Sequence, residues 1–220
     1  MSGAESRSLS SEVVRPGPRD WARIGLWLVT ATLAYNVIEA VIALWSGAEA
    51  ESIALFGFGL DSMIECAAAG VLLWRLRLET RGVDSCSLEA AERRVRRFVG
   101  ASFAALALYV SAQSLLTWWR QAAPAPSPVG IALAAASLVV MPLVSWGKLR
   151  AAREIRSAAL RAEAKETLAC SYLSFALLLG LVANELAGWW WADPLAALAM
   201  VPWLVKEGNE GLRGEVCHEH

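Results

Sequence analysis

Two acidic residues four positions apart, Asp61 and Glu65, stand in an almost wholly apolar stretch of the chain, residues 52–73. About 20 consecutive apolar residues in a helix cross the hydrocarbon core of a bilayer, so this stretch is a candidate membrane span. An ionised acid at the bilayer centre costs roughly 2.5–3.5 kcal/mol on insertion scales. Since residues four apart share one helix face, a bound cation, protons or a partner residue must neutralise the two acids together.

A second polar face lies in another apolar stretch, residues 162–187. Its members recur at spacings of three and four, as one face of a helix does; they are Glu163, Glu166, Thr167, Cys170, Ser171 and Ser174. Glu166 and Cys170 repeat the spacing of Asp61 and Glu65, so two helices offer four donors around one cation. Carboxylate and thiolate donors in a four-coordinate site suit Zn²⁺.

Each of these residue types also has a role that needs no metal. An acid near a span end, such as Glu163, can lie at the membrane interface. A single cysteine in an apolar helix usually packs as a small hydrophobic residue, and serines on a buried face support helix packing. Asp61 and Glu65 are harder to explain in this way, because no Lys or Arg is expected deep in a predicted span. A cation or proton site is therefore the favoured interpretation.

The composition indicates a polytopic membrane protein. The chain of 220 residues is 56% hydrophobic with a mean hydropathy of +0.43, which is too apolar for a soluble domain of this size. Its net charge of −1 gives no reason to expect a nucleic-acid partner, and its four cysteines have no zinc-finger spacing. Residues 1–20 are rich in Ser, Gly and Pro and lack the apolar core of a cleavable signal, so a disordered cytosolic leader is expected.

The apolar pattern predicts an all-α integral membrane fold of six transmembrane helices. The expected spans are residues 21–46, 52–74, 98–119, 129–146, 162–187 and 193–205. Prolines at 124, 126 and 128 break the chain between the third and fourth spans. Residues 148–161 are expected to form a basic helical connector, and residues 207–220 a short cytosolic tail.

The basic residues predict the orientation. Of the 20 Lys and Arg residues, Arg120 alone falls on the far side of the six predicted spans. Excess Lys and Arg marks the cytoplasmic side. We therefore expect a multi-pass protein of the cell (inner or plasma) membrane with both termini in the cytoplasm.

Two stretches resemble the metal-binding motifs of the cation diffusion facilitator family of divalent-metal/proton antiporters. SIALFGFGLDSMIE, residues 52–65, resembles the motif of span two and places Asp61 and Glu65 at its ligand positions. AEAKETLACS, residues 162–171, resembles the motif of span five and places Glu166 and Cys170 there. GWWWADP, residues 188–194, is similar to the family's sequence before span six.

The resemblance covers about residues 21–211 and implies six spans, cytosolic termini and a metal site shared by spans two and five. The implied metal ligands are Asp61, Glu65, Glu166 and Cys170. Glu39 stands where some zinc transporters of the family carry a span-one Glu, and Asn36 lies three residues before it. Glu39 and Asn36, together with Glu163 and Thr167 from the polar face of span five, are expected as accessory residues.

The sequence departs from the family pattern in two ways. The span-five pair is Glu and Cys where the family has His and Asp, and a register shifted by one residue would select Thr167 and Ser171, which are poorer ligands. We also expect no counterpart of the family's cytosolic domain in these residues. The last four residues, Cys217 to His220, are either a compact metal-binding group or an incidental polar terminus.

The expected function is efflux of a divalent transition metal, zinc being favoured, in exchange for protons by alternating access. Manganese, iron, cobalt or cadmium are alternative substrates. A non-transporting membrane protein that holds a structural metal is the rival interpretation. An enzyme is not expected, because both histidines lie at the end of the chain and no catalytic group falls in a span.

The expected partners follow from this function. They are a divalent cation, protons, the lipid bilayer and a second copy of the chain, with no nucleic acid and no cofactor other than the transported metal. Dimerisation is expected to rest on span contacts, for example on the small-residue face of Gly100, Ala104 and Ser111.

Overall fold

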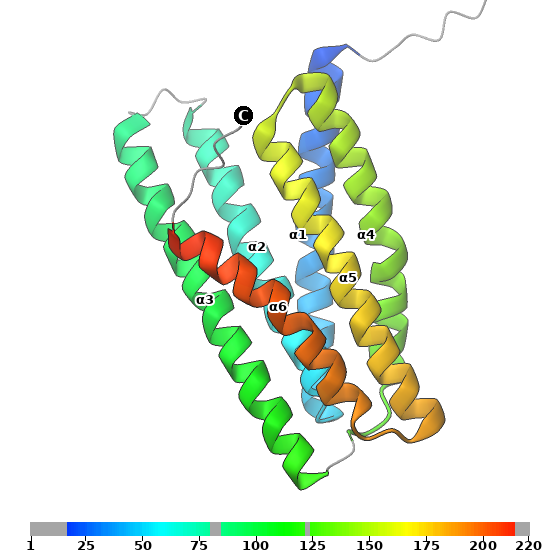
Figure 1. The fold of residues 1–220 in the computed structure, drawn as a ribbon. Helices are drawn as coiled ribbons and strands as arrows, with labels where there is room; N and C mark the ends of the chain where they lie inside the picture. Colours follow the sequence, from blue (N-terminus) through cyan, green and yellow to red (C-terminus); the bar gives the residue numbers. More distant parts are fainter. Residues whose placement is uncertain (1–16, 80–84, 122–123, 214–220) are drawn as a thin grey trace, which may run out of the picture.

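A computed structural model of the chain describes residues 17–79, 85–121 and 124–213. These residues form six helices and no strand: α1 (Pro18–Glu49), α2 (Ile53–Glu79), α3 (Ser85–Arg120), α4 (Pro128–Ile155), α5 (Ala158–Ala187) and α6 (Ala192–Arg213) (Figure 1). The all-α prediction is confirmed. Of the expected leader, residues 1–16 lie outside the described part and residues 18–20 belong to α1. Of the expected tail, residues 207–213 extend α6, while the Cys217–His220 group lies outside the described residues.

The basic residues expected to form a helical connector between the fourth and fifth spans are helical, but they are not a separate element, because α4 continues to Ile155 and α5 starts at Ala158. Arg156 adopts a left-handed conformation at the end of α4, and the Ser157 hydroxyl accepts the backbone N–H of Leu160 to cap α5. The buried apolar residues in the α4 part of this segment are small. They are Ala151 and Ala152, which pack with Val29 and Leu160.

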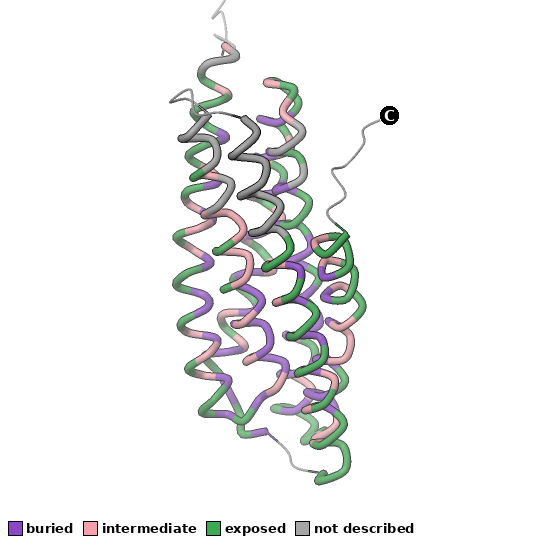
Figure 2. Tube along the Cα trace, turned by 90° about the vertical axis from the view of Figure 1, so that its left-hand side faces the viewer, coloured by how far each residue is buried: buried purple, intermediate pink, exposed green. Residues whose placement is uncertain are grey.

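The helices are arranged with α2 in contact with four others, namely α1, α3, α5 and α6. Helices α1 and α4 pack on each other, α4 pairs with α5, and α3 pairs with α6. Buried positions recur along the helices, as Figure 2 shows in purple. The largest apolar cluster lies mainly between α2, α3, α5 and α6 and includes Phe58, Val110, Leu173 and Met200. This packing sets the faces of α2 and α5 that carry the predicted ligands opposite each other.

Glycines let α3 and α6 approach each other closely. A Cβ atom on Gly100 would lie 2.7 Å from the backbone nitrogen of Leu212, and one on Gly208 would lie 3.1 Å from that of Ala104. At Gly100 this distance is too short for a Cβ atom unless the helices move, and at Gly208 it is tighter than an ordinary contact. The small-residue face expected to serve a dimer is thus used, at Gly100 and Ala104, for contacts within the chain.

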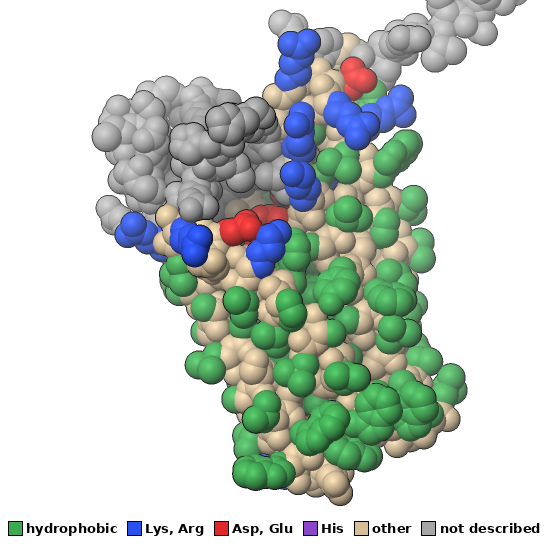
Figure 3. Space-filling view, viewed as in Figure 1, with side chains coloured by type: hydrophobic (Ala, Val, Ile, Leu, Met, Phe, Trp, Pro, Cys, Tyr) green, Lys and Arg blue, Asp and Glu red, His purple; other side chains and the backbone are tan. Residues whose placement is uncertain are grey.

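Five of the helices, α1 to α5, contain segments long and apolar enough to cross a membrane. In α6 the apolar part ends at Val205, before Lys206 and Glu207, so its apolar segment is shorter than those of α1 to α5. In Figure 3 hydrophobic side chains are spread over the lower part of the face, and Lys and Arg side chains lie in its upper half. Large apolar residues such as Trp27, Leu108 and Leu143 are exposed on the outer surface of the helices. A bilayer would cover such a surface.

Candidate metal centre

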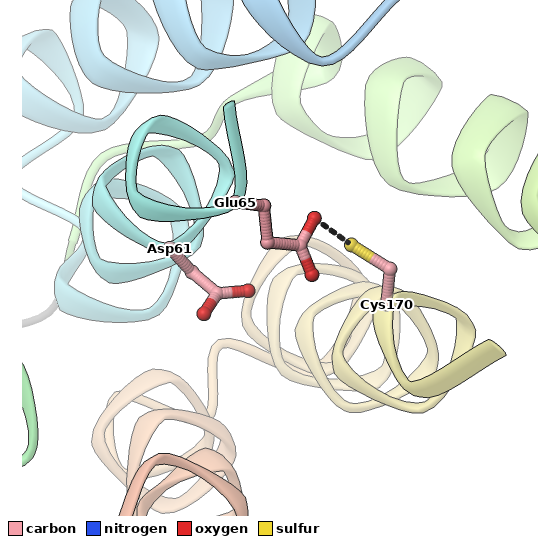
Figure 4. A group of neighbouring side chains, drawn as sticks. All are labelled: Asp61, Glu65 and Cys170. Atoms are coloured by element: carbon pink, nitrogen blue, oxygen red, sulfur yellow. Dashed lines mark hydrogen bonds between the residues drawn. The ribbon is translucent and has the colours of Figure 1, made fainter. Parts of the chain in front are cut away.

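Three chemically reactive side chains meet where α2 faces α5. Asp61 and Glu65 lie on successive turns of α2, and Cys170 lies on α5 (Figure 4). One ligand atom from each side chain lies within 4.8 Å of the others. Asp61 is 2% exposed and Cys170 is fully buried. A cation placed among the three would have two carboxylates and a thiolate as ligands.

The polar contacts of the three residues are unequal. The Cys170 thiol donates to Oε2 of Glu65 at 3.2 Å, and Nδ2 of Asn36 donates to the same oxygen at 3.1 Å. Neither carboxylate oxygen of Asp61 has a hydrogen-bond partner among the described residues, although both are buried. A buried carboxylate without donors is strongly disfavoured. Asp61 therefore requires a proton or a cation, which fits the predicted site.

Glu166, the fourth predicted ligand, is not part of this group of three. It lies one turn from Cys170 on α5 and is exposed. It lines a cavity of about 20 Å³ together with Glu65, Asn36 and Thr167. The structure thus brings together Asp61, Glu65 and Cys170 and places Glu166 beside them. Metal binding by these four residues stays a prediction.

Glu39, a predicted accessory residue, is satisfied by neighbours within the protein. Its carboxylate accepts hydrogen bonds from Ser62 of α2, at 3.2 Å, and from Ser137 of α4. The hydroxyls of Tyr35 and Ser137 lie 2.8 Å apart. Since these groups belong to three helices, Glu39 joins α1, α2 and α4 next to the centre.

A buried base lies near the centre, contrary to the expectation from the sequence. Lys148 of α4 is fully buried, and its Nζ donates to Oε1 of Glu163 at 2.8 Å and to the Thr167 hydroxyl at 2.9 Å. Glu163 is therefore buried in an ion pair rather than exposed at an interface. The signal was present in the sequence, because Lys148 and Glu163 are spaced almost symmetrically about the turn at Arg156.

Asp193, from the GWWWADP stretch, positions the start of α2. Its carboxylate accepts the hydroxyl of Ser52 and the backbone N–H groups of Ile53, at 2.9 Å, and Ala54, at 3.5 Å. These N–H groups lie in the first turn of α2, where backbone N–H groups have no acceptor within their own helix. A residue of α6 thus caps the helix that carries Asp61 and Glu65. The sequence alone did not indicate this contact.

Comparisons with known proteins agree with this architecture. The cation efflux transmembrane domain family matches residues 29–213. The chain is also 30% identical, over 181 residues, to a protein of Synechocystis sp. named "Uncharacterized transporter sll1263". That alignment covers 77% of this chain and 56% of the relative, so the chain spans little more than half of the relative's length.

Proposed function

Because the chain belongs to the cation efflux family, we propose that it exports a divalent transition-metal cation from the cytoplasm in exchange for protons. The membership confirms the resemblance to the cation diffusion facilitators that the two motifs suggested. The metal, the exchange for protons, the orientation in the membrane and a dimeric state are parts of the proposal. Zinc is the favoured substrate.

One observation carries the proposal. Asp61 is buried, and both of its carboxylate oxygens are unpaired among the described residues. It lies close to the carboxylate of Glu65 on its own helix and to the thiol of Cys170 on α5. A structural acid would be expected to have donors, as Glu39 and Asp193 do. An exchange site needs ligands that either a metal or protons can satisfy.

The donor set favours zinc over harder ions. One thiolate and two carboxylates give three protein ligands, and zinc accepts a water or a further oxygen as its fourth. Manganese and ferrous iron prefer oxygen-rich sites, whereas cobalt and cadmium tolerate the thiolate. These four ions remain the alternative substrates.

Exchange follows from the chemistry of the ligands. Carboxylates and thiolates bind metal only when deprotonated, so metal binding releases protons and protonation releases metal. Asp61 and Glu65 belong to α2 and Cys170 to α5, so a movement of one helix past the other would assemble or separate the ligands. Alternating exposure of this centre to the two sides of the membrane would then couple the two flows.

Flux through proteoliposomes tests the proposal. Zn²⁺ uptake into vesicles loaded with a zinc-sensitive dye should occur with the wild-type chain, rise when the interior is acidic, and be lost with Asp61→Asn. Absence of flux with the wild type, or full flux with Asp61→Asn, would refute it. Stoichiometric zinc binding without any flux would support the rival interpretation, a structural metal in a non-transporting protein.

A further inference from the structure

A small cavity lies beside the metal centre, towards the end of the molecule where Lys and Arg gather. It has a volume of about 20 Å³ and is lined on α1 by Asn36, on α2 by Glu65 and Ala69, and on α5 by Glu163, Glu166 and Thr167, among others. Along α2 these residues follow Asp61, and along α5 they precede Cys170. The cavity is thus about one turn nearer the basic end. Its volume suffices for one water molecule or one ion.

Two buried oxygens at this cavity have no hydrogen-bond donor among the described residues. They are Oδ1 of Asn36 and Oε2 of Glu163, whose residues are 6% and 9% exposed. Asn36 uses its amide nitrogen to donate to Glu65, so its oxygen is left unpaired. Glu163 uses its other oxygen, Oε1, to accept from Lys148. Buried polar atoms in proteins are rarely left in this state without a bound species.

The unpaired groups are all acceptors, and the charge around them is negative. Lys148 compensates Glu163, while Glu65 accepts one hydrogen bond from a neutral amide and one from a thiol. A water molecule could satisfy two acceptors with its two protons. A cation satisfies the same two oxygens and also compensates the negative charge of Glu65.

We propose that this cavity, lined by Asn36, Glu65 and Glu163, is a second cation-binding position with oxygen ligands only. Its ligands are Oδ1 of Asn36, Oε2 of Glu163 and the carboxylate of Glu65. Without a thiolate, it takes a hard divalent cation such as Mn²⁺. The inference rests on the proposed transport function, in which this position holds the cation between the basic end and the Asp61–Glu65–Cys170 centre.

Lys148 is the positioning residue of this second site. Its ammonium group donates to one oxygen of Glu163 and to the hydroxyl of Thr167, which fixes the carboxylate and leaves its other oxygen without a donor among the described residues. Fully buried, Lys148 also keeps the charge of Glu163 compensated when no cation is present.

Mn²⁺ binding to the full-length chain in detergent, counted by the loss of the free-ion EPR signal, tests the site. All variants carry Cys217→Ser, His218→Ala and His220→Ala, so that the terminal group cannot bind. In this background Asp61→Asn with Cys170→Ser dismantles the first centre, and we expect one bound Mn²⁺ to remain. Adding Glu163→Gln should weaken it at least tenfold, whereas Glu185→Gln, an exposed change on the same helix, should leave it unchanged.

Glu163→Gln alone could weaken binding by a folding defect, because it leaves the buried charge of Lys148 unpaired. The double variant Glu163→Gln with Lys148→Met removes both charges of the pair and so tests the loss of the ligand by itself. This variant should match the thermal unfolding midpoint of the background and still bind Mn²⁺ at least tenfold more weakly. Mn²⁺ binding that is absent from the background, or unaffected by either Glu163 variant, would overturn the second site. If the wild type transports zinc but the background variant binds no Mn²⁺, the second site is refuted and the transport function stands. If the background variant binds Mn²⁺ but the wild type transports no zinc, the transport function is refuted and the site stands.

Discussion

The thiol of Cys170 on α5 lies 3.2 Å from Oε2 of Glu65 on α2, so one hydrogen bond joins the two helices that carry the candidate ligands. The bond also brings a soft ligand and a hard ligand into one site. Asp61 stands within 4.8 Å of this pair and has no partner of its own among the described residues. The centre is therefore assembled in part and still needs a positive species.

Replacing the thiol should change the metal preference. Cys170→Ser keeps the size of the side chain and its hydrogen bond to Glu65 but removes the thiolate, the ligand that favours softer ions. Zn²⁺ and Cd²⁺ should bind roughly 10–100-fold more weakly, the effect typical of damage to a metal site. Mn²⁺ should change less. Competition titrations with a metal-sensitive dye measure these affinities, and Cys66→Ser, at a half-buried cysteine of α2, is the matched control. Equal losses for all three ions would argue against a thiolate ligand.

Asp61 should be needed for transport but not for folding. Asp61→Asn keeps the shape of the protonated side chain and cannot ionise, so the metal-free protein should be as stable as the wild type or more so. Zinc flux should fall below a tenth of the wild-type rate. Thermal unfolding with and without Zn²⁺ provides the second measurement: Zn²⁺ should raise the unfolding midpoint of the wild type by more than that of Asp61→Asn. A destabilised metal-free variant would indicate a structural role instead.

Residue types and spacing were enough to predict the helices and most of the centre. Apolar runs of sufficient length indicated α1 to α5, and the spacing of four within each motif placed Asp61 with Glu65. Partners between helices were harder to predict. The pairing of Lys148 with Glu163 depends on how far α4 continues, which small buried alanines decide, and the capping of α2 by Asp193 depends on a contact between residues 140 positions apart. The position of Glu166 outside the group of three depends on the rotation of α5, which a motif does not specify.

Loss of the cap on α2 should destabilise the protein. Asp193→Ala removes the acceptor of the Ile53 and Ala54 N–H groups and of the Ser52 hydroxyl, and hydrogen bonds to a charged group contribute about 1.5–3 kcal/mol. We expect a lower thermal unfolding midpoint and weaker zinc binding, because α2 carries two ligands. Glu49→Ala, at an exposed acid close to the turn between α1 and α2, is the control and should change neither. Unchanged stability in Asp193→Ala would contradict the role of the cap.

The contact between α3 and α6 should tolerate no side chain at its glycines. Gly100→Ala would place a Cβ atom 2.7 Å from the backbone nitrogen of Leu212, so the two helices would have to move apart. Overpacking of this kind costs typically about 1–3 kcal/mol. The control is Gly70→Ala in α2, where a Cβ atom meets nothing within 4 Å, and where alanine should stabilise the helix by roughly 0.5–1 kcal/mol. Thermal unfolding of both variants measures the difference, and equal midpoints would exclude the close approach.

The pH dependence of zinc binding should have a fixed sign. Metal binds only to deprotonated carboxylates and thiolate, so affinity should rise with pH, by up to tenfold per pH unit for each proton released. In vesicles, acid on the side that receives the metal should then speed release, and acid on the side that supplies it should slow loading. Cys170→Ser removes the ligand with the highest intrinsic pKa, so its affinity should depend less steeply on pH than that of the wild type. Dye titrations over a range of pH, with the exposed variant Glu185→Gln as control, measure both slopes. Equal slopes for the wild type and Cys170→Ser would mean that the thiol releases no proton on binding and is not a metal ligand.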